Sequence, residues 1–135
     1  MNERMDELQA AKLPDLGATL TTRQKQVARY DEQLAGYGID LPDEHGPVLH
    51  AWRNYVVELD DCDEVRARLS ERGVGTNTPY SPPMNLQPVY TPIGHGPGDF
   101  PHSERSCACL IGLPLGPHLT LDDIDRAANT LITVL

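Results

Sequence analysis

Apolar side chains recur at helical spacing near the start of the chain. Pro14 interrupts any helix that continues from Met5, because proline lacks the amide hydrogen that a helix interior needs. The pattern therefore predicts a short first helix and then a longer one over about residues 19–35, which Gly36 and Gly38 end. Six residues fall on steps of three, four and seven and so share one face of these helices: Leu13, Leu16, Leu20, Val27, Tyr30 and Leu34.

Strand patterns follow the first helices. The stretch HAWRNYVVEL, residues 50–59, alternates apolar and polar positions and is rich in β-forming residues, so it predicts a strand. Asp61 or Asp63 is placed to cap a helix that follows this strand. A shorter second strand is expected over residues 73–80, and a third over residues 110–115.

The second half of the chain is rich in proline and ends in a helix. Residues 79–98 are too rich in proline for regular structure, and we expect a loop that wraps a surface or lines a site. Pro101 is placed to begin a short helix, and Thr120 to cap the last one. The apolar positions of the last helix predict a buried stripe made of Leu121, Ile124, Ala128, Leu131 and Leu135.

These elements predict a single α+β domain over residues 1–135. Residues 1–38 are expected to form N-terminal helices, and residues 48–135 an α/β core that contains the Pro-rich loop 79–98. The sheet is expected to be small, antiparallel or mixed, with about three strands covered by helices.

Charge and cysteine content exclude several classes of function. The formal net charge is −9, from 20 acidic and 11 basic residues that do not cluster, so nucleic acid is not an expected partner. No apolar run approaches the roughly 18 residues of a membrane span, and the N-terminus lacks a signal pattern. Cys62, Cys107 and Cys109 are too few for a disulfide framework. We therefore expect a reduced, cytoplasmic protein with no membrane contact.

A group of metal-ligating residue types lies between residues 95 and 109. Their spacing fits no compact zinc pattern, so we favour structural roles and predict no metal site. Ser103 and Ser106 next to His102 also lack the sequence of a nucleophile elbow. The metal-ligating types are His95, Asp99, His102, Cys107 and Cys109.

The chain contains seven segments in this order: NERMDELQAA, KLPDL, RYDEQLAG, HAWRNYVV, YSPPMNLQPVY, GDFPHSERS and LPLGPHLTLDDIDRAANTL. This order resembles the C-terminal part of the DegT/StrS-type aminotransferases. The resemblance runs from Asn2 to the last residue, and its most specific motifs are NxRM…QAA and LQPxY…GDFPxSE. Members of this family are pyridoxal-phosphate (PLP) enzymes that aminate keto-sugars attached to nucleotides. The resemblance implies the fold of the small C-terminal domain of fold-type I PLP aminotransferases.

The resemblance also bears on the cofactor. In the family, a large domain ahead of the NxRM segment carries the lysine that forms the aldimine with PLP. This sequence has two lysines, Lys12 and Lys25, and neither follows the family's aldimine motif. Asn2 and Arg4 resemble residues that reach the cofactor phosphate of the neighbouring subunit, so they are vestigial phosphate contacts by this resemblance. We expect no cofactor on this chain alone, and PLP only where a large-domain partner completes the site.

Several positions depart from the family's pattern. The strand motif often reads His-x-x-His-x-Tyr, whereas this chain has His50 and then Arg53. Asn85 stands where histidine typically precedes LQP, and Pro79 stands where histidine is common ahead of Tyr80. These substitutions remove imidazoles that transfer protons near physiological pH, so inherited transaminase chemistry becomes less plausible.

Two functional hypotheses follow. The first is a stand-alone, truncated homologue without transaminase activity of its own, which acts as an accessory or partner domain in sugar or natural-product biosynthesis. The alternative is a small PLP-independent enzyme or ligand-binding protein in a natural-product pathway, with a pocket around Tyr80 and Arg53. A homodimer or a partner aminotransferase chain suits either hypothesis, since apolar surface left bare promotes association. No catalytic residue is assigned; the alternative would use Tyr80, Arg53, His50, Asn85, Tyr90 and Trp52.

Overall fold

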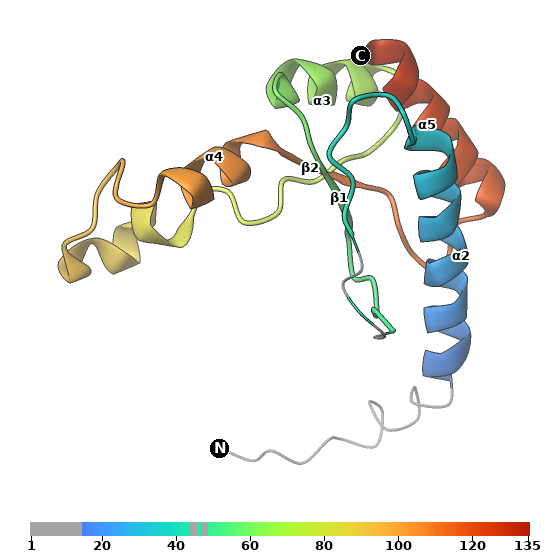
Figure 1. The fold of residues 1–135 in the computed structure, drawn as a ribbon, viewed down its shortest axis with the longest axis horizontal. Helices are drawn as coiled ribbons and strands as arrows, with labels where there is room; N and C mark the ends of the chain where they lie inside the picture. The colour runs from blue at the N-terminus through green and yellow to red at the C-terminus, as the bar shows by residue number, and fades with distance from the viewer. Residues whose placement is uncertain (1–14, 44–45, 47–48) are drawn as a thin grey trace.

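A computed structural model describes residues 15–43, 46 and 49–135 (Figure 1). The short first helix that the sequence predicts lies outside these residues. The described elements, in chain order, are α2 (Leu16–Leu34), β1 (Tyr55–Glu58), α3 (Cys62–Glu71), the 3-10 helices η2 (Met84–Leu86) and η3 (Pro88–Ile93), α4 (Pro101–Cys109), β2 (Leu110–Leu113) and α5 (Leu121–Val134).

The sheet is a short antiparallel pair. β1 pairs with β2 in a register that places Tyr55 opposite Leu113 and Glu58 opposite Leu110. The described residues therefore form two strands, not three, and an α+β fold with a small antiparallel sheet. The strand expected over residues 73–80 is reduced to an isolated bridge between Asn77 and Gly112.

Local sequence explains why the strands are shorter than expected. Trp52 has a φ of 44°, which an extended strand does not tolerate, so β1 begins only at Tyr55. The segment after α3 contains few β-formers and is flanked by Gly73 and Pro79. At its one paired position the side chain of Asn77 lies over Gly112, where a Cβ atom would collide with it.

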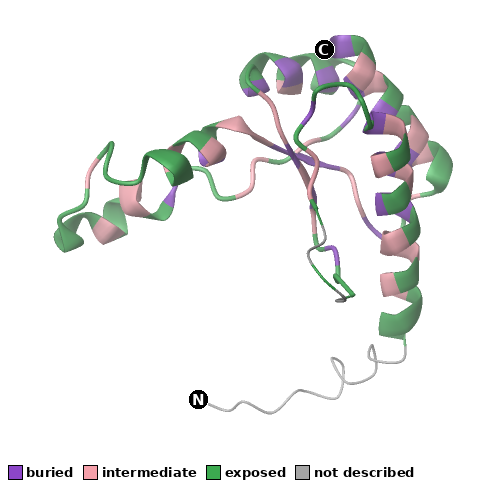
Figure 2. Ribbon diagram, in the orientation of Figure 1, coloured by how far each residue is buried: buried purple, intermediate pink, exposed green. Residues whose placement is uncertain are grey.

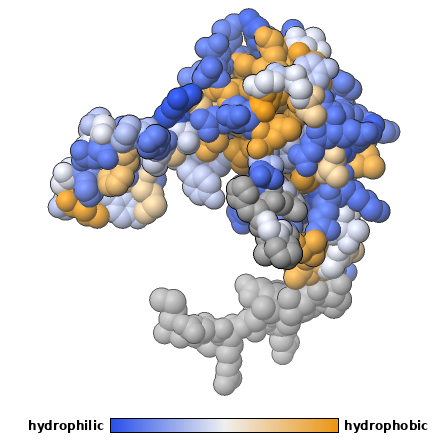
Figure 3. All heavy atoms as spheres, viewed as in Figure 1, coloured by the Kyte–Doolittle hydropathy of each residue, from blue (hydrophilic) through white to orange (hydrophobic). Residues whose placement is uncertain are grey.

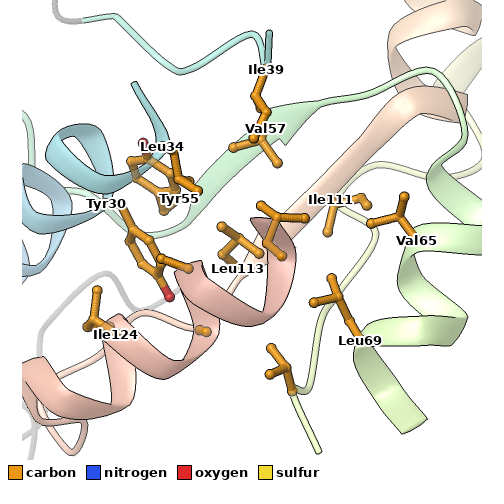
Figure 4. Packing of buried hydrophobic residues seen from close by; sticks show 14 of the residues in the cluster. Tyr30, Leu34, Ile39, Tyr55, Val57, Val65, Leu69, Ile111, Leu113 and Ile124 are labelled. Carbon is orange, nitrogen blue, oxygen red and sulfur yellow. The ribbon is translucent and has the colours of Figure 1, made fainter. Parts of the chain in front are cut away.

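The hydrophobic core lies between the sheet and the helices α2, α3 and α5. Figure 2 shows buried residues concentrated there, and Figure 4 shows Tyr30 and Tyr55 side by side. Their rings stack with centroids 4.7 Å apart, and both side chains are fully buried. Burial of each large apolar side chain contributes roughly 1.5–3 kcal/mol. The other large, fully buried apolar side chains are Leu34, Val57, Leu69, Ile111, Ile124 and Leu131.

Both tyrosine hydroxyls are satisfied inside this core. The Tyr55 hydroxyl donates to Asp31 Oδ1 at 2.6 Å, and the Tyr30 hydroxyl donates to the Pro114 carbonyl at 2.8 Å. Burial raises the pKa of both phenols, and at Tyr55 the bond to Asp31 raises it further. The two phenols therefore stay protonated and act as structural donors.

The last helix begins as the sequence predicts. Thr120 and Asp123 form a reciprocal capping box, so the predicted cap is confirmed. Ile124 and Leu131 are buried as predicted, but Leu121 is 46% exposed and Leu135 52% exposed. Leu121 is the first residue of α5 and Leu135 follows its last residue, so both share the buried face but lie beyond the extent of the core that packs beside the helix. Ala127 and Val134 are buried as well.

Polar contacts join α2 to α5 alongside the core. The Arg29 guanidinium donates to both carboxylate oxygens of Asp125, at 2.7 and 3.0 Å. These bonds hold the pKa of Asp125 below its ordinary value. Gln26 is 1% exposed and bonds to the backbone of Gly116 and Leu119, in the loop before α5.

Residues 79–109 form an arm that projects away from the core and returns to it through α4, whose last residue, Cys109, packs against the core (Figure 1). The arm carries η2, η3 and α4, and Figure 2 shows it as mostly exposed. The predicted irregular loop 79–98 thus contains two 3-10 helices but no α-helix or strand. Figure 3 shows apolar side chains gathered toward the end of the arm and across the core.

Candidate functional site

Arg53 borders a hollow of about 460 Å³ on the core, which we call the Arg53 hollow. Tyr80 is not among its lining residues, so the hollow at Arg53 differs from the shared pocket that the sequence suggested. The lining comes from the residues before β1, the segment after α3, the end of β2 with the loop that follows it, and the first half of α5. These residues are Arg53, Asn54, residues 73–77, residues 112–115, His118, Leu119, Asp123, Arg126 and Ala127.

His50 and Trp52 form a separate pair. The Trp52 backbone amide donates to His50 Nδ1 at 3.0 Å, and the two rings lie 4.4 Å apart between centroids. Trp52 is 6% exposed and lines a second hollow of about 370 Å³ with residues of α2, whereas His50 is exposed. The pair therefore lies at the edge of the core, and Trp52 does not line the Arg53 hollow.

The remaining candidates belong to the arm. Asn85 and Tyr90 are half-buried and line a third, largely apolar hollow of about 220 Å³ with Phe100 and Ile93. Tyr80 is 78% exposed and has a φ of 63°, a strained conformation for a residue with a side chain. The structure thus distributes the six candidate residues over three places and does not bring them together.

Glu104 organises the arm, and sequence reasoning missed it. Its carboxylate accepts hydrogen bonds from the backbone amides of Gly98 at 2.9 Å and Phe100 at 3.3 Å. It also accepts one from Asn85 Nδ2 at 3.0 Å, which ties η2 to α4. These donors, the Gly98 amide first, lower the pKa of Glu104. The GDFPxSE motif contains this glutamate, and its position four residues after Phe100 was the available signal.

Glu104→Gln is expected to loosen the arm without unfolding the core. The variant replaces a charged acceptor with a weaker one, so hydrogen exchange at Gly98 and Phe100 should rise by roughly three- to tenfold. Glu71→Gln, an exposed change at the end of α3, is the matched control and should leave the arm amides unchanged. Equal exchange in the wild type and Glu104→Gln would contradict this role.

The same bonds predict a pH dependence for the arm. The folded pKa of Glu104 lies below the ordinary value of 4.5, so the unfolded arm binds the proton more tightly. Protection is therefore complete above about pH 4.5 and is lost as the pH falls through the folded pKa. The Glu104→Gln variant should lack this step.

The described residues do not fit a covalently held PLP. An aldimine requires a lysine in a formed pocket, but Lys25 is exposed on α2 and lines none of the three hollows described above. Lys12, Asn2 and Arg4 lie outside the described residues. The phosphate contacts suggested for Asn2 and Arg4 therefore stay a prediction.

Metal-ligating and thiol side chains are scattered over residues 15–43, 46 and 49–135. This part of the chain contains no group of three or more histidine, cysteine or acidic side chains arranged to hold a metal ion. His95 and Asp99 do lie 3.3 Å apart in the arm. Cys62, Cys107 and Cys109 are all free thiols. None of the described helices is long and apolar enough to cross a membrane.

Comparison with protein families gives a match over nearly the whole chain. Residues 1–132 match the model of the DegT/DnrJ/EryC1/StrS aminotransferase family. The chain is 35% identical over 135 residues to the erythromycin biosynthesis sensory transduction protein EryC1 of Saccharopolyspora erythraea, covering 96% of this chain and 37% of that protein. It is 35% identical over 123 residues to the dTDP-3-amino-3,4,6-trideoxy-alpha-D-glucose transaminase of Streptomyces venezuelae, covering 87% and 32%.

A solved structure agrees with the family match. The chain superimposes on Streptomyces venezuelae DesV, solved in complex with a ketimine intermediate, with a TM-score of 0.90 and 32% identity. The match covers 96% of this chain and 36% of DesV. The chain therefore spans about a third of the length of the relatives it matches.

Proposed function

Because the chain belongs to the DegT/DnrJ/EryC1/StrS aminotransferase family, we propose that its 135 residues act as a partner of a large-domain aminotransferase chain and do not transaminate alone. The placement of lysine carries this proposal. The sequence has only Lys12 and Lys25, and Lys25 is exposed on the outer face of α2. An imine-forming lysine needs a desolvated pocket that lowers its pKa.

The arm supplies a second line of support. It presents large apolar side chains to solvent, and a patch of this kind commonly marks an interaction surface. A large-domain chain is the proposed occupant, since the relatives that this chain matches are about three times as long. The exposed apolar residues of the arm are Tyr80, Met84, Val89, Ile93 and Phe100.

The pathway is proposed from the relatives' names. EryC1 is named for erythromycin biosynthesis, and the Streptomyces venezuelae relative is a transaminase of a dTDP-linked amino sugar. We extend to this chain a role in sugar or natural-product biosynthesis, with PLP bound only in the completed assembly. Asn2 and Arg4 would then contact the cofactor phosphate, since an arginine fork and an amide suit a phosphate dianion.

Complementation tests the proposal directly. The chain alone with PLP should give no stable internal-aldimine absorbance band and no amination of a keto-sugar nucleotide. Addition of a DesV fragment that lacks the region matched here should restore amination. A restored activity that falls at least about tenfold in Asn2→Ala/Arg4→Ala, but not in Lys25→Gln, would support the phosphate contacts. Amination by the isolated chain would overturn the proposal.

Sedimentation distinguishes the partner from a second copy. If the arm binds a large-domain chain, a mixture should sediment as a hetero-complex, and Ile93→Glu should abolish it. A homodimer at about tens of micromolar that persists when the large-domain fragment is added would instead assign the arm to self-association.

A further inference from the structure

The Arg53 hollow is lined by several polar groups that have no hydrogen-bond partner among the described residues. Arg53, Asn54, Thr76 and His118 line it, and no hydrogen bond joins any of these side chains to another described residue. The backbone amides of Gly75 and Thr76 donate to no described acceptor either. Hydrogen-bond donors from segments far apart in the sequence thus converge on one concave surface.

The uncompensated charge in this hollow is positive, although the chain as a whole carries −9. The lining carboxylate, Asp123, accepts hydrogen bonds from Thr120 and from Arg126 at 3.1 Å, so its charge is already paired. The Thr120 hydrogen bonds, and then the charges of Arg126 and His118, lower the pKa of Asp123. Arg53 has no such partner among the described residues. Distant acidic groups are screened over about 8 Å at physiological ionic strength, so the local arginine dominates.

The remaining walls give the hollow the character of a small-molecule site. Leu115, Leu119 and Ala127 supply apolar surface to its lining. The volume of about 460 Å³ lies within the usual range for such sites, roughly 300–1,000 Å³. None of the lining residues belongs to the arm, which Figure 1 shows projecting from the core.

We propose that the Arg53 hollow binds a small, hydroxylated phosphate monoester. The Arg53 guanidinium would hold the phosphate through two parallel hydrogen bonds, the geometry in which arginine binds oxyanions most strongly. His118 donates a further bond to the phosphate, while Asn54 and Thr76 pair with hydroxyl groups of the ligand. The site is independent of the proposed partner of the arm, because the two use different surfaces.

Titration with ribose 5-phosphate, followed by amide NMR shifts of the full chain, tests this site. Ribose serves as the uncharged comparator and ribonate as the carboxylate comparator, at matched ionic strength. Ribose 5-phosphate should shift the amides of Gly75, Thr76 and Gly112 with saturation, whereas ribose should not. The absence of these shifts, or tighter binding of ribonate, would overturn the proposal.

Charge-matched variants distinguish specific phosphate binding in the Arg53 hollow from nonspecific electrostatic attraction. Arg53 is exposed, so the Arg53→Gln variant should fold normally. It should nevertheless weaken ribose 5-phosphate binding by about tenfold or more. Arg53→Lys keeps the charge but loses the two parallel hydrogen bonds, so its affinity for ribose 5-phosphate should lie between those of the wild type and Arg53→Gln. Lys25→Gln removes the same charge from α2 and should change the dissociation constant by less than about twofold. Equal losses in Arg53→Gln and Lys25→Gln would assign the binding to net charge and reject the site.

Discussion

Replacement of Leu131 by alanine should lower the free energy of unfolding by about 2–5 kcal/mol. Leu131 is fully buried in α5, within the cluster that also contains Tyr30 and Ile124. The substitution removes apolar area from the core and leaves a cavity that the surrounding side chains fill only in part. A loss of this size is a large fraction of the total stability of a domain, typically 5–15 kcal/mol.

Leu121→Ala is the matched control, since it makes the same chemical change in the same helix. Leu121 is 46% exposed, so its loss should cost less than about 0.5 kcal/mol. Urea denaturation followed by circular dichroism measures both variants, and the slope m should stay unchanged. Similar destabilisation by the two substitutions would mean that α5 packs through a different face.

Leu131 and Leu121 also show which burial the apolar periodicity of α5 predicts and which it does not. The apolar spacing correctly predicts the helix and its buried Ile124 and Leu131, because the repeat of 3.6 residues is a property of the backbone. It fails at Leu121 and Leu135, because burial at a helix end depends on what the tertiary structure places beside it. The cap at Thr120 is predictable, since its partner Asp123 is only three residues away.

The sheet shows the same limit. The centres of the two strands are visible in the sequence as short runs of β-forming residues, from Tyr55 and from Leu110. The absence of a third strand over residues 73–80 is not visible in the sequence. It depends on pairing with β2, which is limited to the bridge between Asn77 and Gly112. Such pairing is a long-range contact that local propensity does not specify.

The candidate residues share polar or aromatic chemistry and lie within the family's motifs. The fold separates Arg53 on the core from Asn85 and Tyr90 on the arm, and so divides the pocket that the sequence suggested. The Arg53 hollow instead depends on Thr76 and His118, which lie far along the chain. No spacing rule connects these positions, because the antiparallel pairing of β1 and β2 and the packing of α5 bring them together.

Gln26 is a further residue that the sequence pattern conceals. In an amphipathic helix, a glutamine beside Val27 is expected to face solvent, yet this side chain is 1% exposed. Its Nε2 donates to the carbonyls of Gly116 and Leu119, at 2.9 and 2.8 Å. Its Oε1 accepts from the Gly116 amide at 3.1 Å. One side chain thus satisfies three backbone groups of the loop that leads into α5.

Gln26→Met should therefore destabilise the protein by about 2–4 kcal/mol, although methionine is similar in size and more apolar. The cost arises because buried backbone groups of Gly116 and Leu119 lose their partner and gain no water. Gln24→Met, two residues earlier on α2, is the control; Gln24 has no hydrogen bond with a described residue, so less than about 0.5 kcal/mol is expected.

Gln26→Glu separates hydrogen bonding from packing. It preserves the shape of the side chain but turns an oxygen toward the carbonyls of Gly116 and Leu119, so at neutral pH it should destabilise at least as much as Gln26→Met. Protonation restores a donor, and the deficit should shrink as the pH falls. If urea denaturation shows Gln26→Met to be as stable as the wild type, the loop does not depend on these bonds, and the apolar contacts between α2 and α5 alone hold it in place.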